Sequence, residues 1–167
     1  MPAGNTYEAI ATQTLGSAAA SVTFSSIPGT YTDLVLVAST STTHSAATNL
    51  RYKFNGSSAS IYSGVFLTGD GSSAASSTSG GTSTFGYFGT ITNSATEFGV
   101  VVCSINNYSN ATTFKTTLSR ANYASGMTSA VVGLAQTTSA VSSLLIQFGA
   151  GDLRTGSTFS LYGIASA

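Results

Sequence analysis

The sequence predicts an all-β fold, an antiparallel β-sandwich built as a single domain. Apolar and polar residues alternate with a period of two along many short segments, as they do in half-buried strands. Gly, Pro and Asn turn signals separate these segments, a spacing typical of sandwiches and barrels. No segment shows a clear helical period. The chain has 167 residues, which is enough for one domain with its own core and too few for two.

Each strand follows from its own residue pattern. Segment 21–25 places Val22 and Phe24 on one face, and segment 31–39 is a longer apolar run that we expect to be mostly buried. Segment 49–54 sets three apolar residues against Asn49, Arg51 and Lys53, so one face should be buried and the other wet. Further strands are expected at 83–91, 97–105, 113–123, 129–137 and 142–149, the last with Leu144, Ile146 and Phe148 pointing inward.

Turn chemistry marks the ends of these strands. Pro28-Gly29 fits a type II turn, because Pro fixes the first central φ and Gly accepts a positive second one. Asn55-Gly56 is a strong short-range turn signal. Gly-rich turns are also expected at 69–73 and 149–152. The segment 68–84 is rich in Ser and Gly, and we expect it to be a long exposed loop within the sandwich.

The final segment, 156–164, alternates Phe159 and Leu161 with polar residues and carries no charge. An exposed apolar strand edge promotes aggregation, so natural proteins cover it. We therefore expect another part of the fold to cover this strand.

The charge of the chain is low and balanced. Charged residues make up 6 % of the sequence and the net charge is zero, whereas about a third of the residues are Ser or Thr. Binding to nucleic acid requires clustered Lys and Arg, but the basic residues here are scattered at 51, 53, 115, 120 and 154. We expect no nucleic-acid partner. A surface with so little charge does little to oppose association.

The sequence offers few groups for catalysis. His44 is the single histidine, and we expect it to be exposed and non-catalytic, although Asp33 or Asp70 and one of many serines would complete a hydrolytic triad in principle. The acids at 8, 33, 70, 97 and 152 are dispersed, and His and Cys are too few for a zinc site. We expect a non-enzymatic protein with no catalytic, cofactor-binding or metal-binding residues.

Other side chains have ordinary structural interpretations. Cys103 is the single cysteine and lies in an apolar run, so we expect a buried thiol. The sequons at Asn55, Asn107 and Asn110 are discounted because a Ser/Thr-rich chain produces them by chance. The eight tyrosines are expected to pack in the core or in an interface rather than to form a sugar-stacking platform. We also expect neither a signal peptide nor a membrane-spanning segment.

Three stretches carry a resemblance to a known family. Residues 12–40, residues 50–63 and the closing GDLRTGSTFSLYGI are similar to a family of small virion proteins of tailed, often marine, bacteriophages. The segment around Ile27-Pro28-Gly29-Thr30-Tyr31 is its most specific part. Relatives often carry an acidic residue after the Asn-Gly turn, whereas Ser57 stands there in this chain, so no role of that acid is carried over.

The resemblance implies a jelly-roll β-sandwich, often trimeric, displayed on a virion. In a jelly roll the final strand lies beside an early one, which implies that segment 156–164 lies inside a sheet beside residues 6–15. Residues 1–10 would be a docking arm or edge strand, and residues 11–167 the jelly roll. The expected function is a capsid decoration or fibre-type protein that contacts the major capsid protein or tail components, made in the cytoplasm of the infected bacterium. The alternative is a tail-fibre module that recognises a host surface glycan. Head and tail locations stay open.

Overall fold

The chain folds as a β-sandwich, as the sequence predicts. The computed structural model describes residues 6–81, 83–123 and 126–165. Within them twelve strands pair antiparallel in two sheets and form one domain without helix. The strands are β1 (Tyr7–Thr14), β2 (Ser21–Phe24), β3 (Asp33–Thr40), β4 (Thr48–Phe54), β5 (Tyr62–Gly69), β6 (Ala74–Thr78), β7 (Gly86–Ile91), β8 (Gly99–Asn106), β9 (Lys115–Tyr123), β10 (Met127–Ala135), β11 (Leu144–Phe148) and β12 (Thr158–Ile164).

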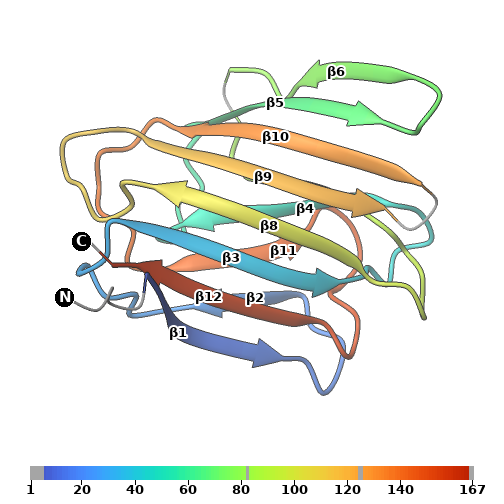
Figure 1. Cartoon of the computed structure of the whole chain (residues 1–167), viewed down its shortest axis with the longest axis horizontal. Helices are drawn as coiled ribbons and strands as arrows, with labels where there is room; N and C mark the ends of the chain where they lie inside the picture. The colour runs from blue at the N-terminus through green and yellow to red at the C-terminus, as the bar shows by residue number, and fades with distance from the viewer. Residues whose placement is uncertain (1–5, 82, 124–125, 166–167) are drawn as a thin grey trace.

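The two sheets differ in size. The larger has eight strands in the order β1-β12-β3-β8-β9-β10-β5-β6, and it faces the reader in Figure 1. The smaller has four strands in the order β2-β11-β4-β7 and lies behind it. Because the small sheet covers only one side of the large one, the large sheet keeps an outer face of eight strands. The jelly-roll connectivity that the resemblance implies stays a prediction.

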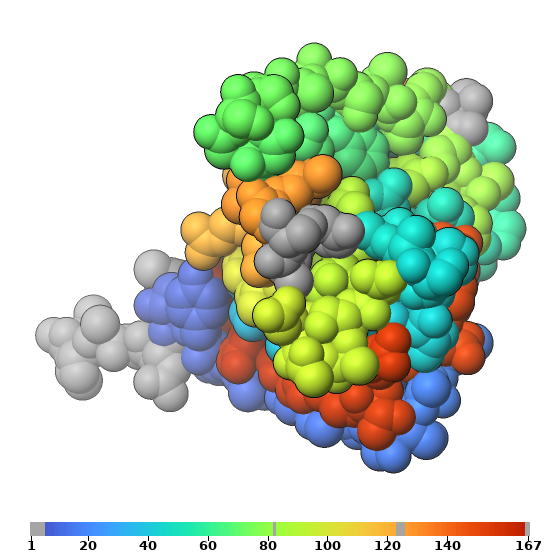
Figure 2. Space-filling view, turned by 90° about the vertical axis from the view of Figure 1, so that its right-hand side faces the viewer, coloured from blue at the N-terminus to red at the C-terminus, as the bar shows by residue number. Residues whose placement is uncertain are grey.

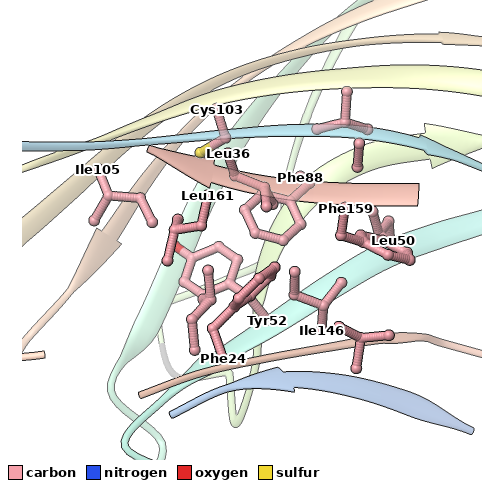
Figure 3. Close-up of a cluster of buried hydrophobic side chains, with 14 of the residues drawn as sticks. Phe24, Leu36, Leu50, Tyr52, Phe88, Cys103, Ile105, Ile146, Phe159 and Leu161 are labelled. Atoms are coloured by element: carbon pink, nitrogen blue, oxygen red, sulfur yellow. The ribbon is translucent and has the colours of Figure 1, made fainter. Parts of the chain in front are cut away.

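The core lies between the sheets and follows the alternation of the strands. Segment 49–54 behaves as predicted, since Leu50, Tyr52 and Phe54 are buried and the residues between them are only half-buried. The large sheet contributes Leu36, Cys103, Phe159 and Leu161 to the same cluster, and the small sheet contributes Phe24 and Ile146 (Figure 3). Leu144, Ile146 and Phe148 are all buried, as predicted.

The closing strand is covered on both sides, which confirms the prediction made for it. In β12, Leu161 pairs with Ala11 of β1 on one side and with Leu36 of β3 on the other. Both Phe159 and Leu161 are fully buried. The first strand of the chain is therefore the edge strand, and residues 7–10 belong to it rather than to a free arm. The rest of the proposed arm, residues 1–5, lies outside the described residues.

The prediction of a long exposed loop at 68–84 is wrong. β5 runs to Gly69, a tight turn follows, and β6 then pairs with β5 in a hairpin. All five residues of β6 are exposed. Its small, exposed residues carry no burial signal, and the strand is defined by its pairing with β5. The sequence pattern also gave no sign of β5, whose core face includes Gly64.

The apolar run in segment 31–39 is mostly buried, as predicted: within β3 the inner face is buried, most of the outer face is half-buried, and Val37 is 38 % exposed. One turn prediction is corrected. Pro28-Gly29 does not form a type II turn, because Gly29 lacks the positive φ that such a turn requires, and the positive φ falls at Ser26 instead. The turn at Asn55-Gly56 is confirmed, with positive φ at both residues.

Candidate functional site

The most unusual surface of the molecule is the outer face of the large sheet. Outward positions of a sheet that faces water are normally polar. Here the central strands β3, β8, β9, β10 and β5 present aliphatic side chains instead. We call this surface the apolar face; its members are Val35, Val37, Val65, Leu67, Val100, Val102, Leu118 and Val132.

The apolar face is organised in cross-strand rows. Leu118 of β9 pairs with Val132 of β10, which pairs with Val65 of β5. These three neighbours are 56 %, 53 % and 50 % exposed. In the next row, Val37 of β3 pairs with Val102 of β8. Soluble monomers rarely expose a contiguous apolar patch of this kind, and such patches commonly mark interaction sites.

Two charged residues stand on outward positions of this sheet. Arg120 lies in the second row, between Val102 of β8 and Ala130 of β10. Asp33 stands at the start of β3 and accepts a hydrogen bond from the backbone N–H of Asn107 at 2.7 Å. The face thus carries one charge of each sign, separated by aliphatic side chains.

One end of the apolar face is hollowed. The β5–β6 hairpin, green in Figure 2, overhangs the sheet beside β10. Beneath it lies an open groove of about 790 Å³, lined by Leu67, Val100, Val102, Arg120 and Ala130 together with residues of β6. Leu67, Val100 and Val102 belong to both the groove and the apolar face, so the two form one continuous surface.

The residues that the sequence singles out for catalysis do not come together. His44 is half-buried rather than exposed, and its Nδ1 lies 3.2 Å from the carbonyl oxygen of Ala46 in its own loop. The carboxylate of Asp33 accepts the hydrogen bond from the Asn107 N–H. Asp70 accepts hydrogen bonds from the backbone N–H groups of Ser72 and Ser73 in the β5–β6 turn. These contacts hold the pKa of Asp70 well below its usual range.

The remaining acids are also separate from one another. Glu8 accepts a hydrogen bond from the Tyr31 hydroxyl at 3.1 Å, and this bond is the main reason that the pKa of Tyr31 is raised. Glu97 and Asp152 lie exposed in two different loops. In the described part of the chain, no three His, Cys, Asp or Glu side chains gather as metal ligands would.

Other predictions about individual side chains are confirmed. Cys103 is fully buried, and burial raises the pKa of its thiol. Tyr52, Tyr62 and Tyr108 are buried, so these tyrosines pack in the core. The side chain of Asn55 is used structurally, since its amide donates to the Ala140 carbonyl and its oxygen accepts from the N–H of Ser142.

The basic residues are less scattered than the sequence indicates. Arg51 and Lys53 lie two residues apart on β4 and meet Phe85 and Tyr87 on the outer side of the small sheet. Lys115 is buried instead, and its ammonium donates to the carbonyl oxygens of Asn110, Thr113 and Thr138. It therefore clamps two loops together.

Comparisons of the chain with known protein families, with curated proteins and with solved structures found no match. None of the residues that the structure describes forms a helix long and apolar enough to cross a membrane. The molecule is a β-sandwich whose large sheet carries an apolar outer face.

Proposed function

We propose that this chain is a non-enzymatic structural protein of a bacteriophage virion, displayed on the particle surface as a capsid decoration or fibre-type protein. Two arguments support the proposal. The resemblance of residues 12–40, 50–63 and the closing segment indicates the class of protein, and the apolar face supplies the surface through which such a protein assembles. The observation that carries most weight is the row Leu118–Val132–Val65, three half-exposed aliphatic neighbours on adjacent strands.

The occupant of the apolar face, in this proposal, is another copy of the chain in a homotrimer. Burial of aliphatic side chains stabilises an assembly by about 25 cal/mol per Å² removed from water. A partner without an acid would leave the guanidinium of Arg120 desolvated and unpaired, which is costly. A second copy brings Asp33 on the same sheet face, so it offers an acid that can pair with the guanidinium.

The other virion components would contact the trimer elsewhere. A chain with so few charges must dock through shape-matched, largely uncharged contacts. Raising salt from about 0.1 to about 1 M shortens the Debye length from about 10 to about 3 Å but leaves apolar burial intact. The protein is therefore expected to stay on purified virions at high salt.

A phage that lacks this gene tests the proposal. Purified virions are analysed by mass spectrometry for the protein, and mutant virions are measured for thermal rupture and for adsorption to host cells. A decoration protein is expected to be present in wild-type virions, and its loss should lower the rupture temperature while adsorption stays normal. Lost adsorption with normal rupture would favour the tail-fibre alternative, and absence of the protein from wild-type virions would contradict both.

A further inference from the structure

A cluster of two cations and two aromatic rings lies on the outer side of the small sheet, on a different sheet from the apolar face. Arg51 and Lys53 occupy neighbouring outward positions of β4, Tyr87 belongs to β7, and Phe85 directly precedes that strand. The Arg51 guanidinium carbon lies 5.5 Å from the centroids of both rings. The Lys53 ammonium lies 4.3 Å from the centroid of Phe85. We call these four residues the cation–aromatic cluster.

The guanidinium of Arg51 lies over the backbone of Gly149. A Cβ atom built at Gly149 would fall 2.5 Å from one terminal nitrogen of Arg51 and 2.7 Å from its guanidinium carbon. The guanidinium therefore occupies the space that any larger residue at 149 would need. With Phe85 and Tyr87 at its other sides, it is oriented before any ligand arrives.

The donors of this guanidinium are not used within the described part of the chain. The Nε atom of Arg51 is buried and has no hydrogen-bond partner there. Lys53 donates one hydrogen bond, to the Ser58 hydroxyl at 2.7 Å. Arg has five N–H donors in a planar fork that matches a carboxylate, so an oriented Arg with free donors is suited to bind one.

The charge around the cluster also favours an anion. The other outward residues of the small sheet are neutral, among them Thr23, Asn49, Leu145 and Gln147. Two like charges that share the ring of Phe85 repel each other, and a bound anion would relieve this repulsion. The two cations thus make this side of the sandwich locally positive in a chain of zero net charge.

The surroundings indicate what the anion is attached to. Tyr87 and Phe85 are half-buried and present apolar ring surface, and the Tyr87 hydroxyl lies beside that of Ser83. Ser58 and Gln147 add hydroxyl and amide groups around the cations. Apolar rings edged by neutral hydrogen-bonding groups suit a sugar, whose C–H face packs on an aromatic ring while its hydroxyls bond to polar side chains.

We propose that the cation–aromatic cluster binds an acidic saccharide. The sugar carboxylate bonds to Arg51 and lies near Lys53, and the sugar ring contacts Tyr87 and Phe85. This assignment does not depend on the proposed virion role or on the apolar face. The saccharide proposal and the virion proposal can therefore fail independently of each other.

The test is a titration of the full-length protein, followed by NMR, with oligosaccharides of galacturonic, glucuronic and sialic acid. At least one of them is expected to shift the signals of β4 and β7, and its uncharged methyl ester should bind at least tenfold more weakly. Arg51→Gln should also weaken binding at least tenfold. Arg154→Gln removes the same charge from a loop outside both the cluster and the apolar face, where Arg154 donates to the carbonyl oxygens of Thr42 and Asn93, and should leave binding unchanged.

A second variant tests the orientation of Arg51 rather than its charge. Gly149→Ala keeps both cations but displaces the guanidinium, whose flexible side chain can move without unfolding the protein. Its affinity for the saccharide should fall severalfold at an unchanged Tm. Failure of all three acidic saccharides to bind, equal binding of the methyl ester, or an equal loss in Arg154→Gln would overturn the proposal. Binding of poly-glutamate alone would also overturn it and would point to an acidic protein partner.

Discussion

The Tyr52 hydroxyl and the Thr117 hydroxyl form a 3.0 Å hydrogen bond that joins the two sheets through the core. Tyr52 belongs to β4 of the small sheet and Thr117 to β9 of the large one. Both side chains are buried, so neither hydroxyl has water as an alternative partner. This bond ties the two sheets together beside the cluster of buried hydrophobic side chains in Figure 3, to which Tyr52 belongs.

Removal of this bond should lower the stability of the fold. In Tyr52→Phe the ring stays and the Thr117 hydroxyl is left buried without its partner, which costs about 1–3 kcal/mol. Thr117→Val should cost a similar amount, and the double variant should cost less than the sum of the two. Urea unfolding of the four proteins measures this, and fully additive losses would show that the two hydroxyls do not interact.

The ring of Tyr52 depends on a glycine opposite it. A Cβ atom at Gly86 would fall 2.0 Å from Cζ of Tyr52, and the buried ring has no room to move. Gly86→Ala should therefore destabilise the protein by about 1–3 kcal/mol through overpacking. Gly81→Ala is the matched control, because nothing lies within 4 Å of its Cβ position. Equal Tm values for the two variants would contradict this packing.

Stability should fall at alkaline pH. Burial raises the pKa of the Cys103 thiol and of the Tyr52 and Tyr62 hydroxyls above their ordinary values of 9.0 and 10.0. These groups stay neutral in the fold while they ionise in the unfolded chain, so their contribution is fully present below pH 9 and is lost as pH rises above it. Burial lowers the pKa of Lys115, which works in the opposite direction, whereas the raised pKa values of Tyr31 and Tyr108 add to the loss.

Thermal unfolding between pH 7 and 11 measures this effect. Tm should be nearly constant below pH 9 and should fall steadily above it. Cys103→Ala removes one of the three groups, so its Tm should fall less between pH 8 and 10 than that of the unchanged protein. A Tm that rises with pH in this range would contradict the argument.

The closing strand should be indispensable. Deletion of residues 156–167 removes Phe159 and Leu161 from the core and leaves β1 without its partner. Burial of each side chain contributes about 1.5–3 kcal/mol, against about 5–15 kcal/mol for a whole domain. The truncated chain should be insoluble or unfolded by circular dichroism. Leu161→Ala is a milder variant and should cost about 2–5 kcal/mol. A soluble truncated chain with an unchanged Tm would exclude this role for β12.

The parts of the fold that the sequence predicts are those with a burial signal. Val22 and Phe24 alternate with Ser21 and Thr23, and Leu144 and Ile146 alternate with the half-buried Leu145 and Gln147, because one face of each strand meets the core. β6 has no such signal, since its small residues are exposed on both sides and the strand is defined by its pairing with β5. The turn at Gly29 could not be predicted from sequence either, because a Pro-Gly pair permits a type II turn without requiring one.

The surfaces were harder to predict than the core. Val100 and Val102 follow the same apolar run as the buried Val101 and Cys103, and a continuous run is the usual pattern of a strand buried on both faces. The pattern of apolar residues alone does not distinguish such a strand from one whose outer face is covered by another molecule. The cation–aromatic cluster was missed for a different reason: Arg51 and Phe85 are 34 positions apart, and only the pairing of β4 with β7 brings them together.

If the apolar face joins copies of this chain, light scattering of the purified protein at micromolar concentration should give about three times the chain mass of 16.7 kDa. Val132→Lys places a charge in the middle of the face and should yield the mass of one chain, whereas Thr23→Lys, on the exposed side of the small sheet, should remain trimeric. A single-chain mass for the unchanged protein, or equal dissociation of both variants, would contradict the claim.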